Sequence, residues 1–502
     1  MSDFYLEAIK QARVYDVAIE TPLELAPKLS SRLDNEVLIK REDLQPVFSF
    51  KLRGAYNKIA QLTEAERKSG VICASAGNHA QGVALASHKL GIKATIVMPR
   101  TTPEIKVQAV QRWGAHVILI GDNYSEASIH ADRLCAENSM TFIHPYDDPL
   151  VIAGQGTIAD EILRQAPKDI DAVFIPIGGG GLIAGMAIYL KHYSPETKII
   201  GVEPVDSAAM FDSIKADQRV TLDHVGIFAD GVAVKKVGKL TFDLVQRHVD
   251  DILLVDTDEI CAAIKDIYED NRIIVEPAGA LAVAGLKKYV RENRVRGQVL
   301  AAINSGANMN FDRMRHVAER TEMGEGREAL FAVTIPERPG SFLEFCRIIG
   351  GHNVTEFNYR MSSRSEAHVF VGVSITEAEE AKTIQQTLES AELPTLNLHD
   401  NELAKLHIRH MVGGRCALVK NEVLYRFEFP ERPGALLEFL TRANGRWNIS
   451  LFHYRNHAAA FGRVLAGIEV PTKERSEFED YLDSLGYPYV NETDNPAYTI
   501  FL

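Results

Sequence analysis

Between about Val37 and Asn304 the sequence alternates short apolar runs with longer segments of helical periodicity, and this alternation restricts the fold more than any other feature. The apolar runs that we expect to be strands lie at 71–73, 94–97, 116–120, 172–175, 199–202, 252–255 and 299–303. The expected helices between them include 79–90, 103–113, 125–137 and 182–193. This repeated order predicts an α/β fold of twisted, mostly parallel sheets with helices on both faces. Ligands bind such sheets beyond the carboxyl ends of the strands.

Lys51 stands at the start of a helical segment, between the apolar residues Phe50 and Leu52. An ammonium group in such surroundings loses hydration, which favours its neutral, nucleophilic form. A neutral lysine amine can form a Schiff base with an aldehyde, which is how pyridoxal phosphate is held. The alternative interpretation is a lysine that extends its charged end into water.

The segment from Ser75 to His79 follows the expected strand 71–73 and opens a helix. Its small residues let the backbone approach a ligand, and free N–H groups at a helix start can bind a carboxylate or an anionic ring oxygen. Ser75 or Asn78 could instead cap the helix. His79 could likewise be a hydrogen-bonding residue at the helix start and not a base.

Four consecutive glycines, Gly178 to Gly181, lie between strand 172–175 and the helical run that begins at Leu182. Without Cβ atoms, successive N–H groups can converge on a phosphate at the helix N-terminus. The run lacks the Gly-Lys-Ser/Thr ending of a nucleotide-binding P-loop. A flexible linker is the alternative, which the position between a buried strand and an amphipathic helix disfavours.

Ser305 follows the expected strand 299–303. Its hydroxyl could meet the pyridine nitrogen of a bound cofactor, or it could cap the next helix. A neutral hydroxyl does not keep that nitrogen protonated as a carboxylate would. The ring is then a moderate electron sink, which suits elimination better than transamination.

These segments, in this order, resemble those of the fold-type II pyridoxal-phosphate enzymes, and most closely of the biosynthetic threonine ammonia-lyases (threonine deaminases), over essentially the whole chain. The resemblance implies that Lys51 carries pyridoxal 5'-phosphate, that Asn78 contacts the 3'-oxygen of the ring and that Ser305 meets the ring nitrogen. The implied phosphate ligands are Gly178, Gly179, Gly180, Gly181 and the amide of Leu182. The implied substrate-carboxylate loop comprises Ser75, Ala76, Gly77, Asn78 and His79.

The activity that the resemblance implies is deamination of L-threonine to 2-oxobutanoate and ammonia, the first committed step of isoleucine biosynthesis, with Lys51 as general base. L-Serine should also react, because one methyl group gives a discrimination of only about 1–3 kcal/mol. The alternatives are a related serine or threonine β-elimination or β-replacement enzyme, and an amino-acid sensor with an inactive cofactor site. Some metal-dependent relatives place a carboxylate six residues beyond the glutamate of their Glu-Pro segment. Because Ala209 stands there in this chain, we expect no metal.

The C-terminal third contains an internal repeat. Residues 331–345 are echoed by 425–439, each with a Pro-Glu-Arg-Pro-Gly sequence, and 356–360 are echoed by 451–455. Each copy predicts a strand, a Pro-Gly turn, a helix, two further strands and a second helix, and the later strands include 368–375 and 462–470. Two copies are too few for a solenoid, so we expect two related α+β modules.

We therefore expect a pyridoxal-phosphate-dependent catalytic domain of two α/β lobes over 1–320, a short charged linker over 321–328, and ACT-like domains over 329–402 and 423–494. By the resemblance, these domains bind isoleucine as inhibitor and valine as an opposing effector, and the enzyme is a homotetramer. Tyr359 and Tyr454 occupy equivalent places in the two copies and are the expected effector contacts. Dimerisation modules without a ligand are the alternative.

The formal charge of −13 disfavours nucleic acid and anionic membranes as partners, because no excess of Lys and Arg offsets phosphates. The five cysteines form no Cys-x-x-Cys pair, which is typical of free thiols in a reducing compartment. The N-terminal segment lacks the pattern of a signal peptide, and no apolar run reaches about 18 residues. We expect a cytoplasmic protein with small-molecule partners.

Overall fold

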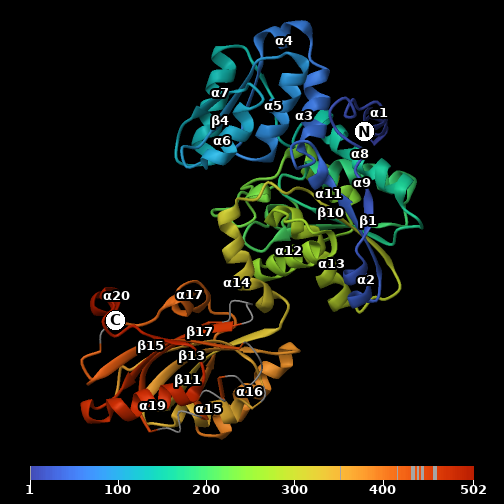
Figure 1. The fold of residues 1–502 in the computed structure, drawn as a ribbon. Coiled ribbons are helices and arrows are strands. Elements are labelled where there is room, and N and C mark those ends of the chain that lie inside the picture. The colour runs from blue at the N-terminus through green and yellow to red at the C-terminus, as the bar shows by residue number, and fades with distance from the viewer. Residues whose placement is uncertain are drawn as a thin grey trace. The chain divides into compact units, whose positions relative to one another are not determined.

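The structure, a computed structural model, describes residues 2–350, 352–414, 416–430, 436–437, 440–441, 446–455 and 461–502. The chain divides into an N-terminal unit, Met1–Gly324, and a C-terminal unit, Glu325–Leu502 (Figure 1). The division falls inside the interval 321–328, where we expect the linker, although residues 321–324 still belong to helix α14 (Met314–Gly324). The Pro-Gly turn of the second repeat, at 431–435, lies outside the described residues.

The larger sheet of the N-terminal unit has the strand order β1-β2-β10-β7-β8-β9. Neighbouring strands run parallel except β1, which is antiparallel to β2. The strands are β1 (Leu23–Leu25), β2 (Glu36–Arg41), β7 (Ala172–Pro176), β8 (Lys198–Pro204), β9 (Asp251–Val255) and β10 (Val299–Asn304). The predicted strands at 172–175, 199–202, 252–255 and 299–303 are confirmed, and they lie in one sheet.

Helices cover both faces of this sheet, as its strands show: every residue of β7 and β10 is buried. Val173 and Ile175 of β7 belong to a core with side chains of α1, α8, α9 and α11, whereas Phe174 belongs to a core with α2, α12 and α13. The helices around this sheet are α1 (Ser2–Lys10), α2 (Pro27–Leu33), α8 (Pro149–Gln165), α9 (Gly181–Tyr193), α10 (Ala209–Lys215), α11 (Lys239–His248), α12 (Thr257–Asn271) and α13 (Pro277–Asn293). Short 3₁₀ helices are η1 (Glu42–Leu44), η2 (Asp230–Val232) and η3 (Phe311–Arg313).

The smaller sheet has the order β5-β4-β3-β6, and all its neighbouring strands are parallel. Its strands are β3 (Val71–Ala74), β4 (Ala94–Met98), β5 (His116–Leu119) and β6 (Thr141–Phe142). The helices of this lobe are α3 (Lys51–Ala60), α4 (Glu64–Ser69), α5 (Asn78–Leu90), α6 (Glu104–Gln111) and α7 (Tyr124–Glu137). The predicted strands at 71–73, 94–97 and 116–120 are confirmed. The sequence did not predict β6, since two residues are too few to show a period.

The C-terminal unit is built on an antiparallel sheet with the order β14-β11-β13-β12-β16-β17-β15-β18. Its strands are β11 (Glu328–Pro336), β12 (Val354–Arg360), β13 (Glu366–Ser374), β14 (Thr395–Asn397), β15 (Glu422–Pro430), β16 (Asn448–Arg455), β17 (Phe461–Glu469) and β18 (Tyr489–Asn491). Its helices are α15 (Ser341–Ile349), α16 (Ala378–Ser390), α17 (Glu402–Leu406), η4 (Ile408–His410), η5 (Thr472–Glu474), α19 (Arg475–Leu485) and α20 (Pro496–Phe501). The first copy of the repeat supplies one half of the sheet and the second copy the other half.

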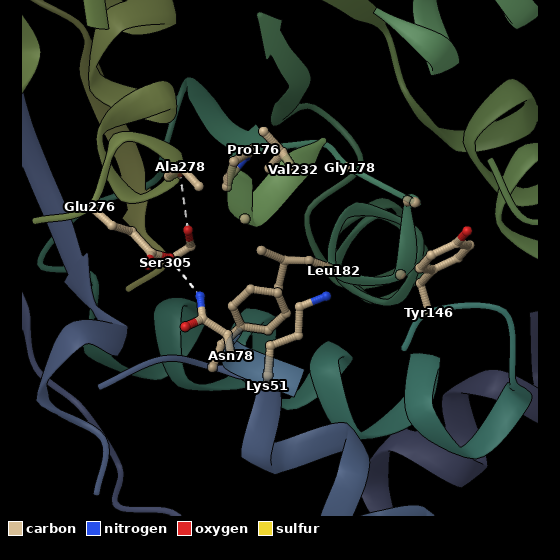
Figure 2. Close-up of a pocket in the computed structure, with 15 residues that line it drawn as sticks. Lys51, Asn78, Tyr146, Pro176, Gly178, Leu182, Val232, Glu276, Ala278 and Ser305 are labelled. Atoms are coloured by element: carbon tan, nitrogen blue, oxygen red, sulfur yellow. Dashed lines mark hydrogen bonds between the residues drawn. The ribbon is translucent and has the colours of Figure 1, made fainter. Parts of the chain in front are cut away.

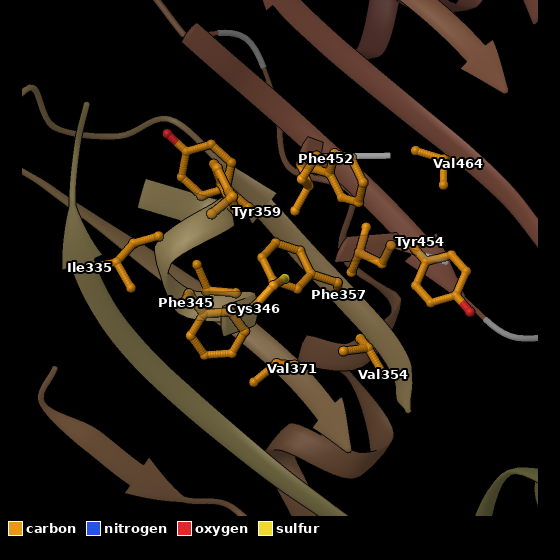
Figure 3. Close-up of a cluster of buried hydrophobic side chains, with 14 of the residues drawn as sticks. Ile335, Phe345, Cys346, Val354, Phe357, Tyr359, Val371, Phe452, Tyr454 and Val464 are labelled. Carbon is orange, nitrogen blue, oxygen red and sulfur yellow. The ribbon is translucent and has the colours of Figure 1, made fainter. Parts of the chain in front are cut away.

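The two copies meet where β12 pairs with β16, and the register there is symmetric. Asn358 and His453, which are equivalent in the repeat, are direct Cα partners. Tyr359 consequently pairs with Phe452, and Tyr454 pairs with Phe357. These side chains belong to one apolar core shared by both copies (Figure 3). The repeat in the sequence therefore becomes an approximate two-fold arrangement of two modules in one sheet.

A buried group of charged side chains connects three segments of the N-terminal unit. The guanidinium of Arg53, on α3, donates to Glu42 Oε1 at 2.7 Å and to Glu161 Oε1, on α8, at 2.6 Å. Lys40 Nζ, on β2, lies 2.6 Å from Glu161 Oε2. All four side chains are fully buried, and two cations face two carboxylates, so the group is balanced in charge.

Replacing Arg53 by Met should strongly destabilise the protein, because the carboxylates of Glu42 and Glu161 would stay buried without their shared partner. We expect the free energy of unfolding of the N-terminal unit to fall by about 3–5 kcal/mol, measured by urea denaturation. The control is Arg164→Ala, which removes a half-exposed arginine paired with Glu20 and Asp160 and should cost less than about 1 kcal/mol. Equal costs for the two variants would contradict this account.

Candidate active site

Three of the predicted segments follow the carboxyl ends of adjacent parallel strands in the larger sheet. Strand β10 lies between β2 and β7. After β2 the chain passes through η1 and reaches Lys51; after β10 comes Ser305; after β7 come the four glycines. Asn78 belongs to the smaller lobe and lies at the start of α5, just beyond β3. The topology therefore brings together residues that are up to about 250 positions apart in the sequence.

These segments surround a cavity with an empty volume of about 420 Å³ (Figure 2). Its lining includes eight of the residues that the sequence predicted, namely Lys51, Asn78, Gly178, Gly179, Gly180, Gly181, Leu182 and Ser305. It also includes Phe50, Tyr146, Pro176, Gly231, Val232, Glu276 and Ala278.

The amine of Lys51 lies inside this cavity. Its Nζ is 3.5 Å from the carbonyl oxygen of Pro145 and 5.2 Å from the centre of the Phe50 ring. Burial lowers the pKa of Lys51 to about 8, although the carboxyl group of Glu276 acts in the opposite direction. The structure therefore agrees with the expectation from sequence that this amine is neutral more often than a solvated lysine.

The four-glycine turn has no room for side chains. A Cβ at residue 179 would lie 2.2 Å from ring carbons of Tyr146, and Gly180 has a φ of +92°. The hydroxyl of Thr241 donates to the carbonyl oxygen of Gly179 at 2.6 Å, so that carbonyl is turned into the protein. Helix α9 begins at Gly181. The turn therefore presents backbone N–H groups at a helix N-terminus, as phosphate binding requires.

Backbone hydrogen bonds join the Lys51 segment to the Ser305 segment. The N–H of Phe50 donates to the carbonyl oxygen of Ser305 at 3.3 Å, and the N–H of Ala307 donates to that of Phe48 at 2.9 Å. The Ser305 hydroxyl lies 3.2 Å from the carbonyl oxygen of Ala278. A hydroxyl can rotate, so this group can also donate into the cavity.

Of the predicted carboxylate loop, only Asn78 lines the cavity. The hydroxyl of Ser75 accepts a hydrogen bond from the N–H of Gly77 at 3.3 Å. His79 is buried, with Nε2 2.8 Å from the carbonyl oxygen of Ile143, and burial lowers its pKa to about 3. The imidazole is therefore neutral at physiological pH. A substrate-binding role for Ser75, Ala76, Gly77 and His79 stays a prediction.

Glu203 is a buried carboxyl group outside this cavity lining. Burial raises the pKa of Glu203 to about 8, and its oxygens accept from the N–H groups of Met210 and Phe211 at 2.9 and 2.8 Å.

Within the residues that the structure covers, no three or more His, Cys, Asp or Glu side chains are grouped so as to hold a metal ion. The described helices also include none with the length and apolar character to cross a bilayer.

Two protein-family models match the chain. The pyridoxal-phosphate dependent enzyme family matches residues 14–306, and the C-terminal regulatory domain of threonine dehydratase matches residues 319–408 and again 413–502. The chain belongs to the threonine dehydratase family. The predicted fold class and the resemblance are thereby confirmed, and so is pyridoxal phosphate as the family's cofactor.

Two bacterial relatives match almost the whole chain. The chain is 56% identical to the L-threonine dehydratase biosynthetic IlvA of Burkholderia multivorans over 99% of both chains. It is 54% identical to that of Escherichia coli K12, over 99% of this chain and 97% of the other. A solved structure of processed threonine deaminase isoform 2 from Solanum lycopersicum is 53% identical, with a TM-score of 0.62 over 63% of this chain and 92% of that chain.

The residues of the cavity fit the cofactor of the family. The glycine turn suits a phosphate, Lys51 presents a desolvated amine, and Ser305 presents a neutral hydroxyl. Tyr146 and Glu276 also line the cavity, although the sequence did not predict them as site residues. Tyr146 lies in a loop without a pattern of its own. Glu276 directly precedes the apolar helix α13, so the position of a carboxylate before an apolar helix was the available signal.

We expect the reactivity of Lys51 to rise with pH around a midpoint near 8, because burial lowers its pKa and only the neutral amine attacks acylating reagents. The measurement is the rate of acylation of Lys51 in cofactor-free protein, followed by peptide mass spectrometry from pH 6 to 11. Lys51→Ala identifies the peptide signal that depends on this amine. A midpoint at or above about 10, the value of a solvated lysine, would contradict the burial argument.

Proposed function

We propose that this chain converts L-threonine to 2-oxobutanoate and ammonia, as the first committed step of isoleucine biosynthesis. One structural observation carries the proposal: the Lys51 amine enters the same cavity as the four-glycine turn, Asn78 and Ser305. The full-length similarity to proteins named biosynthetic L-threonine dehydratase supports the same substrate and reaction.

We assign the roles of the site residues as follows. Lys51 binds the aldehyde of pyridoxal phosphate, and the N–H groups of the turn hold its phosphate. Asn78 contacts the 3'-oxygen of the ring, and Ser305 meets the ring nitrogen. The turn residues are Gly178, Gly179, Gly180, Gly181 and Leu182.

When bound, pyridoxal phosphate supplies an electron-withdrawing ring that makes the Cα proton of an amino acid easier to remove. Once the amine of the substrate has displaced it from the aldehyde, Lys51 Nζ accepts that proton, because a pKa near 8 leaves a usable neutral fraction at physiological pH. Phe50, Leu182 and Val232 line the cavity and restrict water there, which strengthens the interactions of charged groups. The neutral hydroxyl of Ser305 favours elimination of the β-hydroxyl, and the released enamine is hydrolysed in water to the keto acid and ammonia.

L-Serine is a second expected substrate, because it differs from threonine by one methyl group. The remaining rival is a β-replacement enzyme of the same fold, which would consume an external nucleophile such as sulfide and release little keto acid. An inactive amino-acid sensor is disfavoured, since such a protein has no need for a desolvated amine in the cavity.

We propose that the C-terminal unit binds isoleucine as feedback inhibitor and valine as an opposing effector. The family match to a regulatory domain of threonine dehydratase over both copies of the repeat supports a regulatory role. We also propose that the enzyme is a homotetramer and lies in the cytoplasm. Tyr359 and Tyr454 remain our effector-contact candidates, and both side chains are buried in the core shared by the two copies. The hydroxyl of Tyr359 donates to the carboxylate of Glu337.

Lys51→Ala should abolish both cofactor attachment and turnover. We expect keto-acid formation from L-threonine to fall by at least about 10²–10⁴-fold, and the absorbance band of the lysine-bound cofactor to disappear. The control is Lys68→Ala, which removes an exposed lysine paired with Glu64 in the same unit. Adding sulfide to the wild-type assay distinguishes the β-replacement rival. Substantial turnover by the Lys51 variant would refute the assignment of the base.

Tyr359→Phe combined with Tyr454→Phe should weaken inhibition by isoleucine, because each change removes one hydroxyl with little change in volume. We expect the half-inhibitory isoleucine concentration to rise by at least about 10-fold, because each lost hydrogen bond costs about 1.4 kcal/mol. Inhibition is measured relative to the uninhibited rate of each variant, and thermal midpoints report any loss of stability. If the double variant is inhibited like the wild type, these tyrosines do not contact the effector.

A further inference from the structure

Glu276 is a buried carboxyl group in the wall of the cavity. The residue is 4% exposed and lies on the cavity lining with Asn78 and Ser305 (Figure 2). Glu276 is the residue before the first turn of α13, but its side chain does not cap that helix. It turns to Asn78 instead, and Oε1 accepts a hydrogen bond from Asn78 Nδ2 at 2.6 Å. A simple helix-capping role therefore does not explain this carboxylate.

A continuous chain of hydrogen bonds sets the orientation of the Asn78 amide. Asn308 Nδ2 donates to the carbonyl oxygen of Val47 at 2.8 Å and to Asn78 Oδ1 at 2.7 Å. At the other end, Asn78 Nδ2 donates to Glu276. The Val47 carbonyl can only accept, so the nitrogen of Asn308 must face it, and Asn78 must then present its oxygen to Asn308. One hydrogen on Asn78 Nδ2 remains as the only side-chain donor of Asn78 not engaged in this chain.

The loop after β10 is shaped around Glu276. The N–H of Glu276 donates to the carbonyl oxygen of Gly306 at 3.2 Å. A Cβ at residue 306 would lie 2.8 Å from Glu276 Oε1 and 3.0 Å from the carbonyl oxygen of Phe48, so a larger residue there would displace the carboxylate or the backbone. Gly306 thus leaves room for Glu276, and Asn308 supports Asn78 from the same loop.

We propose that Glu276 is a positioning residue that holds the Asn78 amide with its free hydrogen directed at the 3'-oxygen of the cofactor ring. The inference rests on the contact between Asn78 and that oxygen in the proposed function. Asn308 fixes which atom of the amide faces the cavity, and Glu276 fixes the rotation of the amide. What matters is the place of the accepting oxygen of Glu276, not the charge that it carries.

Three substitutions of Glu276 distinguish the effect of the position of its accepting oxygen from the effect of its charge. Glu276→Gln keeps an accepting oxygen at the same distance along the side chain and removes the charge. Glu276→Asp keeps the charge but withdraws the oxygens by one methylene group, and Glu276→Ala removes the acceptor. We expect Gln to preserve the function of Asn78, and Asp and Ala to lose it.

The test compares two ligands on the full chain after its cofactor has been removed. Pyridoxal phosphate and its 3-deoxy analogue, which lacks the 3'-oxygen but keeps the aldehyde and phosphate, are titrated while absorbance follows their attachment to Lys51. For Glu276→Asp, Glu276→Ala and Asn78→Ala we expect the dissociation constant of pyridoxal phosphate to rise about 10-fold, as for one lost hydrogen bond, with no change for the analogue. Glu276→Ala added to Asn78→Ala should have no further effect, and Glu276→Gln should resemble the wild type.

The possible results distinguish this inference from the proposed function. If Asn78→Ala weakens only pyridoxal phosphate while the Asp and Ala variants of Glu276 bind it normally, the positioning role is wrong and the Asn78 contact stands. If those Glu276 variants weaken both ligands equally, Glu276 shapes the whole cavity and the inference is also wrong. If Asn78→Ala does not discriminate between the ligands, both the contact and the inference fail. Thermal midpoints of the cofactor-free variants identify any that do not fold, and the Gln and Asp pair then decides.

Discussion

The ion pairs of Arg53 with Glu42 and Glu161 are the interaction on which the position of the active amine depends. Arg53 lies two residues after Lys51 on the first turn of α3, so fixing its guanidinium fixes the start of that helix. Glu42 follows β2, and Glu161 lies on α8 of the larger lobe. Because charges buried at this depth must be paired, α3 cannot shift against these two segments without a large cost. The same contact that stabilises the lobe therefore also orients Lys51.

Segments from both lobes of the N-terminal unit line the cavity together. The backbone hydrogen bonds between the Lys51 and Ser305 segments close one side, and the four-glycine turn closes another. Glu276 and Asn308 connect the larger lobe to Asn78 from the smaller lobe. An amine, an amide and a hydroxyl thereby reach one small volume from two lobes, although each has its own structural support. This arrangement suits a planar ligand that must be held on several edges at once.

The strand–helix alternation predicted the larger elements, because buried parallel strands are continuously apolar and the helices between them have a clear period. It did not predict β1, β2 or β6. Strand β6 pairs with β3 and is too short to show a pattern. The sequence predicted Lys51, Asn78, Ser305 and the glycine turn as site residues, because each lies at the end of an expected strand or the start of an expected helix. Tyr146 could not, since only the folded chain places its ring against Gly179.

The sequence by itself determined the order of the elements, the repeat in the C-terminal third and the residue types that can hold an aldehyde, a phosphate and a pyridine nitrogen. Local backbone preferences and periodic burial are enough for this. Only the tertiary structure decided that Glu276 supports Asn78, that His79 is buried and neutral, and that Tyr359 and Tyr454 lie in a shared core. These properties depend on partners far away in the sequence, and hydrogen bonding and desolvation act through distances in space.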